Sequence, residues 1–265
     1  MVLQDLKRGL GNWTLWLGIV VYTAILVMMM GPYTLGAIGS SPVLIFGWLL
    51  AGELAFLPSL LCVLPLSTAF YDEWNSLYYR FAVSRLGWKR YGIERVVSTA
   101  ILGGFSIMLP LTFCMLACYL NFPEANATEH VFKMDFPLYR SWLPGGPAQM
   151  NTLSQGQILR LERWLALVWL LRLFTFGACW SQLGLAVSAW VDDWALVQVI
   201  PFVVFALTDW IAGNAGLHFL DCSSLIGLGG LAFYPLWVSF VVPLCWGIIF
   251  VTLFILGLRR RRARE

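Results

Sequence analysis

Two charged residues lie inside long apolar segments and are the first candidates for chemistry within a membrane. Glu53 falls in the segment 43–66 and Arg172 in the segment 161–189, each at a similar distance from the start of its segment. A charge near the middle of a bilayer costs at least about 2.5–3.5 kcal/mol unless it is paired or hydrated. We therefore predict an intramembrane ion pair between Glu53 and Arg172, which either fixes helix packing or lines a translocation path.

The motifs of common catalytic and cofactor sites do not occur in the sequence. No glycine-rich loop ends in Lys-Ser or Lys-Thr, so ATP binding through a P-loop is not expected. The motif HExxH does not occur either, and the only histidines, His130 and His218, are too few to suggest a metal site. We therefore expect a non-catalytic chain without a cofactor or a metal.

The composition indicates that most of the chain lies in a membrane. Hydrophobic residues make up 60% of the 265 residues and charged residues 12%, whereas soluble domains are about 25% charged. Apolar segments of about 20 residues must form helices in hydrocarbon, because their backbone polar groups need partners there. We predict an all-α polytopic membrane protein, one transmembrane domain over residues 1–265, in which Asp192 and Asp193 cap the fifth span. The predicted spans are 13–30, 43–66, 93–120, 161–189, 196–215 and 233–258.

The cations predict the orientation of these spans. They gather in three segments: before the first span (Lys7 and Arg8), between the second and third (from Arg80 to Arg95), and after the sixth (from Arg259). The positive-inside rule places all three in the cytoplasm, so we expect cytoplasmic termini, an external segment 121–160 and a location in the cell membrane. The terminal arginines are expected to bind anionic lipid, and nucleic acid is not expected as a partner.

The cytoplasmic segment 67–92 is longer and more aromatic than a linker requires. Its apolar residues Phe70, Trp74, Leu77, Tyr78 and Phe81 recur at helical spacing, which predicts an amphipathic helix over 70–81. The polar face of that helix is expected to carry Asp72, Glu73, Asn75, Ser76, Tyr79 and Arg80. Gly87 then permits a bend into the third span. The spacing alone leaves two interpretations open: a helix that lies among lipid headgroups, or a helix that docks on a cytoplasmic partner.

Two stretches resemble a known family of transport proteins. "FYDEWNSLYYRFAVSRLGWKRYGIERVV" is similar in residue order to the cytoplasmic elbow of ABC-2 type ABC transporter permeases, especially the six-span permeases of Gram-positive bacteria. "FGACWSQLGLAVSAWVDD" resembles the end of the fourth span in the same family. The chain departs from the family where a Gly-Thr pair is common (here Asn75-Ser76) and where a Lys commonly opens the third span (here Glu94-Arg95).

The resemblance implies a permease subunit that pairs with a second permease copy or a paralogue and binds separate cytoplasmic ATPase subunits. It implies an exporter or an antimicrobial-peptide immunity pump, with ATP hydrolysis on the partner chain. The elbow would be the coupling helix that contacts the ATPase. The residues to which this role carries over are Phe70, Asp72, Glu73, Trp74, Asn75, Tyr78 and Arg85.

Two other functions remain open at this point. A secondary transporter would use Glu53 as an ion-linked carboxylate, although no clear internal repeat supports that interpretation. A non-transporting membrane anchor would not need a charged pair inside the membrane.

Overall fold

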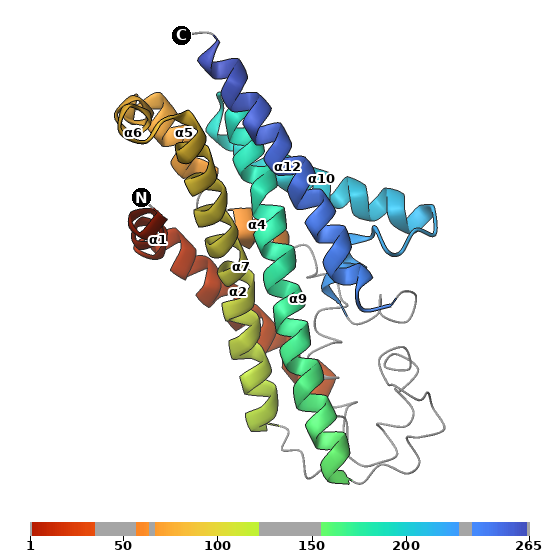
Figure 1. Cartoon of the computed structure of the whole chain (residues 1–265). Coiled ribbons are helices and arrows are strands. Elements are labelled where there is room, and N and C mark those ends of the chain that lie inside the picture. Colours follow the sequence, from red (N-terminus) through yellow and green to blue (C-terminus); the bar gives the residue numbers. More distant parts are fainter. Residues whose placement is uncertain (1, 35–56, 64–66, 122–154, 228–234, 264–265) are drawn as a thin grey trace.

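The described part of the chain is all-helical, with turns and short connections between the helices. The computed structural model describes residues 2–34, 57–63, 67–121, 155–227 and 235–263 (Figure 1). Its helices are α1 (Val2–Leu10), α2 (Trp13–Thr34), α4 (Leu57–Val63), α5 (Ser67–Asn75), α6 (Tyr78–Leu86), α7 (Trp88–Asn121), α9 (Gln155–Trp190), α10 (Trp194–Asn214), α11 (Cys222–Ile226) and α12 (Val238–Arg262). The prediction of an all-α chain is confirmed for these residues.

Four of these helices are long and apolar enough to cross a membrane: α7, α9, α10 and α12. They overlap the predicted spans 93–120, 161–189, 196–215 and 233–258. A shorter apolar helix over Trp13–Met29 lies in the predicted first span. Most of the predicted second span, 43–66, lies outside the described residues, so the full set of six spans stays a prediction.

Helix α9 is the centre of the bundle and packs against both α7 and α12. Its contact with α7 depends on small residues: a methyl group built on Gly177 would lie 2.6 Å from the Gly103 carbonyl oxygen. The Ser181 hydroxyl donates to the Thr99 carbonyl across the same contact, at 3.1 Å. Small residues let helix backbones approach closely in membrane proteins, where the hydrophobic effect does not drive helices together.

The contact of α9 with α12 consists of aromatic packing around Trp180 and, farther along the helices, a close approach of the two backbones. The Trp180 ring lies 5.4 Å from Trp246 and 5.7 Å from Phe250, both edge to face. Near the far end of α12, a methyl group on Gly257 would lie 2.7 Å from the Ala189 Cβ. These contacts hold α12 along one side of α9 (Figure 1).

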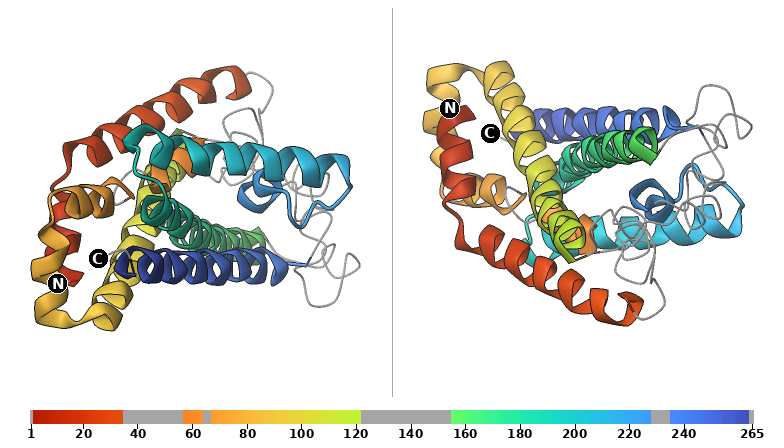
Figure 2. Two further views of the ribbon diagram at one scale, coloured as in Figure 1. Left: turned by 90° about the horizontal axis from the view of Figure 1, so that it is seen from above. Right: turned by 90° about the horizontal axis from the view of Figure 1, so that it is seen from below.

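The described N-terminal helix and the C-terminal end of α12 lie toward the same end of the bundle, where α5 and α6 also lie (Figures 1 and 2). Helix α10 starts beside that end and then diverges from α12 (Figure 1). Asp193 caps α10, as predicted, because its carboxylate accepts from the amides of Ala195 and Leu196. Asp192 does not cap the helix; it pairs with Arg261 on α12 at 2.6 Å.

Candidate functional site: the charge network beneath the α5–α6 hairpin

The predicted amphipathic helix over 70–81 is divided in the structure. Helix α5 ends at Asn75 and α6 begins at Tyr78, with Leu77 between them in the left-handed region at φ 59° and ψ 9°. A leucine in this region costs about 1–2 kcal/mol, so local sequence preference did not predict the break. Gly87, at φ 75°, ends α6 and turns the chain into α7, at the bend that the sequence predicted.

The break changes which side chains face the bundle. Tyr79, expected on the polar face of a continuous helix, is buried and stacks on Trp74 with ring centroids 4.0 Å apart. Leu77, Tyr78 and Phe81, expected on one apolar stripe with Phe70 and Trp74, are instead 49%, 53% and 69% exposed. We call the segment 67–86, two short helices joined by the break at Leu77, the α5–α6 hairpin. It has an inner face bound to the bundle and an exposed face that carries large apolar side chains.

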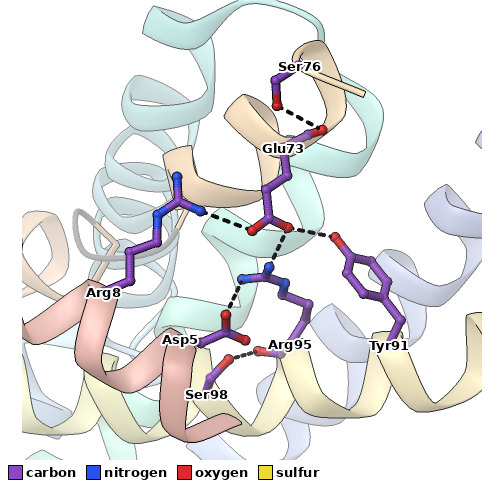
Figure 3. Close-up of polar contacts among 7 residues, drawn as sticks. All are labelled: Asp5, Arg8, Glu73, Ser76, Tyr91, Arg95 and Ser98. Carbon is purple, nitrogen blue, oxygen red and sulfur yellow. Dashed lines mark hydrogen bonds and ion pairs between the residues drawn. The ribbon is translucent and has the colours of Figure 1, made fainter. Parts of the chain in front are cut away.

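Glu73 is the buried centre of a charge network in which Arg8 is the exposed member (Figure 3). Its side chain is only 3% exposed, although the amphipathic pattern placed it on the polar face. One carboxylate oxygen accepts from Arg8 on α1 at 3.1 Å. The other accepts from the Tyr91 hydroxyl at 3.0 Å and from the Arg95 guanidinium, both on α7. This single carboxylate thus joins α5 to the N-terminal helix and to the first turns of a membrane-spanning helix.

The network is electrically balanced. Arg95 also pairs with Asp5 of α1, with 3.4 Å between the guanidinium and the carboxylate, so two arginines face two carboxylates. Burial raises the pKa of Asp5 above its usual value, while Arg95 acts in the opposite direction. Charges taken out of water are tolerated only when they are paired and hydrogen-bonded. Glu73 meets both conditions, whereas Asp5 Oδ2 and Arg95 Nε are buried without a hydrogen-bond partner among the described residues.

A second junction holds the other side of α5. The Arg261 guanidinium of α12 lies 4.6 Å from the centre of the Trp74 ring, a cation–π contact. Arg261 also donates to the carbonyl oxygens of Ala189 at 2.7 Å and of Ser188 at 3.1 Å, at the end of α9. Phe70 packs edge to face on Phe254 of α12, 5.4 Å between centroids. Helix α5 is therefore fixed to α12 and α9 as well as to α1 and α7.

The remaining predicted coupling residues lie on the surface. Asp72, Asn75, Tyr78 and Arg85 are exposed, whereas Phe70 and Glu73 are buried and Trp74 is partly buried. The seven residues assigned to one docking role therefore divide into an inner group, which contacts the bundle, and an outer group, which faces away from it.

The structure describes only one residue of the predicted intramembrane ion pair, Arg172. Glu53 lies outside the described residues, so the pairing stays a prediction. Arg172 is fully buried in α9 and donates to the carbonyl oxygens of Ile226, at 2.8 Å, and Gly227. Trp169, one turn earlier, donates to the same Ile226 carbonyl at 3.0 Å. Arg172 therefore closes the end of the short helix α11, where carbonyl groups lack helical partners.

The sequence interpretation did not identify the partners of Glu73 and Trp74. Asp5 and Arg8 share one face of α1 at a spacing of three residues, and Tyr91 and Arg95 share one face of α7 at a spacing of four. Those spacings indicate that each pair lies on one face of its helix. No local sequence pattern, however, indicates that these two helix faces meet around Glu73. Arg8 and Glu73, for example, are 65 positions apart in the sequence.

The Glu73 carboxylate is engaged in contacts between helices. A carboxylate that already accepts from three donors has its lone pairs committed to neighbouring helices. Within the described residues, no group of three or more His, Cys, Asp or Glu side chains could hold a metal ion. Comparison with known proteins finds no family model, no curated protein and no solved structure that matches this chain.

Proposed function

We propose that this chain is the membrane-spanning subunit of an ATP-driven transporter, an exporter or a peptide immunity pump, that works with a separate ATPase. The α5–α6 hairpin would be its coupling element, and the ATPase would bind the exposed face of the hairpin. A second permease copy or a paralogue would complete the transporter. The resemblance of residues 70–97 to the elbow of ABC-2 type permeases motivates the proposal.

One observation carries the proposal: the hairpin joins an exposed apolar face to a rigidly held inner face. A coupling element must bind a partner and also transmit the partner's movement to the membrane helices. Leu77, Tyr78 and Phe81 could serve the first need because they are large and exposed. Glu73 and Trp74 could serve the second, because their contacts reach α1, α7 and α12.

The two faces predict two different effects of substitution. Replacing Phe81 or Tyr78 by Ala should leave the fold intact, because both side chains are exposed. Aromatic anchors at interfaces commonly contribute about 2 kcal/mol or more, so each substitution should weaken ATPase association more than about tenfold. The measurement is co-purification of the partner from the native membrane at matched expression, together with ATP hydrolysis.

Trp13→Ala is the matched control, since Trp13 is also a largely exposed aromatic residue, at 74% compared with 69% for Phe81, and lies at the start of α2. It should leave ATPase association unchanged. If Phe81→Ala, Tyr78→Ala and wild type all retain a stoichiometric nucleotide-binding partner equally, the hairpin is not the docking site. The interpretation of this segment as a helix among lipid headgroups would then hold.

The same purification separates the proposed function from the other two. If no nucleotide-binding protein accompanies the wild-type chain, the permease proposal fails. Ion-coupled uptake or efflux by the chain alone in vesicles, lost in Glu53→Gln, would then identify a secondary transporter. Absence of any transport would identify an anchor.

A further inference from the structure

A groove runs between α7 and α12 at the end of the bundle where the cations gather. Its volume is about 450 Å³. The C-terminal turns of α12 lie beside the first turns of α7 there (Figure 2). The groove is separate from the Glu73 network, which lies on the face of α7 that meets α1 and α5 (Figure 3).

The floor of the groove is apolar and open at the surface of two helices that could each cross a membrane. It includes Ile93 and Val96 from α7 and Ile255 and Leu258 from α12. Ile93 is 64% exposed and Ile255 is 43% exposed, so the groove is accessible from the outer surface of the bundle. The two helices converge at Gly92, where a methyl group would reach 3.4 Å from Leu258 Cδ1.

Three cations line the same groove at its polar end: Lys89 on α7, and Arg259 and Arg262 on α12. All three are exposed, and within the described residues no carboxylate pairs with any of them. Lys89 precedes Gly92 and Val96 by three and seven residues, and Arg259 and Arg262 follow Ile255 by four and seven. Each helix therefore carries one stripe that is cationic at its end and apolar toward the membrane interior.

The arginines at the end of α12 make two different kinds of contact. Arg260 lies 5.1 Å from the centre of the Trp190 ring, and Arg261 is buried against the end of α9. Arg259 and Arg262, which bracket these two, line the groove instead. A general attraction to anionic headgroups would not require this division.

We propose that the groove binds one anionic phospholipid of the cytoplasmic leaflet. Lys89, Arg259 and Arg262 bind its phosphate headgroup, and an acyl chain lies against Ile93, Val96 and Ile255. Charge complementarity identifies the occupant: basic pockets between helices at the cytoplasmic side suit anionic headgroups, and an apolar floor suits a chain rather than a free phosphate. This inference does not depend on the proposed transport function.

The test measures retained lipid on the full chain. The chain is reconstituted in nanodiscs of mixed phosphatidylglycerol and phosphatidylcholine, extracted in mild detergent, and analysed by native mass spectrometry. Wild type should retain phosphatidylglycerol in preference to phosphatidylcholine. Each cation near the surface contributes about fivefold to anionic-lipid binding, so Lys89→Gln/Arg259→Gln/Arg262→Gln should lose at least about tenfold of that preference.

The matched control is Lys7→Gln/Arg80→Gln/Arg85→Gln, which removes the same types of charge from exposed positions of α1 and α6. It should retain the preference. Ile255→Trp, which fills the groove but keeps the cations, should lose bound lipid as well. If the triple groove variant does not insert, Arg262→Gln alone repeats the test with an expected loss of about fivefold.

Three results would overturn the proposal. The first is equal phosphatidylglycerol preference in wild type and the groove variants. The second is an equal loss in the control, which would indicate general surface charge. The third is loss of a dimer in Ile255→Trp with lipid retention unchanged, which would assign the groove to a second copy of the chain.

Discussion

At the scale of single residues, Glu73 and Trp74 illustrate why charge and aromatic character do not by themselves indicate an exposed binding surface. Both were candidates for direct contact with an ATPase. Glu73 is enclosed by Arg8, Tyr91 and Arg95, and Trp74 lies beneath Arg261. If they take part in coupling, they do so by holding α5 to the bundle.

Glu73→Ala should therefore destabilise the chain. Removing one partner of a buried ion pair costs about 3–5 kcal/mol, because Arg95 would keep a buried charge with Asp5 as its remaining acidic partner. Glu73→Gln keeps the shape and one acceptor and should lose less. The measurement is the thermal unfolding of the purified chain in detergent, with the exposed Asp72→Ala as the control on the same helix. Equal stability of Glu73→Ala and Asp72→Ala would contradict the network.

At the scale of elements, the break at Leu77 determines the shape of the α5–α6 hairpin. A continuous helix would carry Tyr79 to the solvent side and Tyr78 and Phe81 along the stripe of Phe70. The left-handed residue instead reorients α6 relative to α5. Burial of Tyr79 against Trp74 offsets part of the backbone cost.

Leu77→Gly tests that geometry. Glycine adopts a positive φ without the steric cost that leucine bears, and Leu77 is half exposed, so Leu77→Gly should keep or slightly raise stability. Ser84→Gly, within α6, should lower it by about 0.5 kcal/mol. Chemical or thermal unfolding of both variants gives the comparison. A loss in Leu77→Gly as large as that in Ser84→Gly would favour the continuous helix.

At the scale of the whole molecule, two sets of contacts hold the helices together. Around α9, close glycine contacts fix α7 and aromatic contacts fix α12. At the end with the cations, Glu73 and Arg261 connect α1, α5, α7, α9 and α12. A displacement of the hairpin would therefore act on several helices together, which is what the proposed coupling role requires.

The predicted pair of Glu53 and Arg172 belongs to this scale, because it would join the second span to the centre of the bundle. Glu53→Ala or Arg172→Ala should each lower stability by about 3–5 kcal/mol if the site is dry. The exchange Glu53→Arg with Arg172→Glu should recover part of that loss. Unfolding of wild type, Glu53→Ala, Arg172→Ala and the double variant Glu53→Ala/Arg172→Ala forms a double-mutant cycle, and additive losses would mean that the two residues do not interact.

The sequence by itself determined the features that arise within one segment. Apolar segments longer than a bilayer crossing must be helical, which predicted α7, α9, α10 and α12. Asp193 was identifiable as a cap because capping depends on the next few residues. Gly87 was identifiable as a bend because only its own backbone freedom is involved.

Only the tertiary structure decided which side of each helix is covered, and by what. The pattern of α5 shows two kinds of face, but Glu73 is buried because Arg8 and Arg95 approach it from helices distant in the sequence. The terminal arginines are chemically alike, yet Arg261 faces α9 whereas Arg262 faces the groove. Helical periodicity defines faces, whereas packing between distant segments selects the partner of each face.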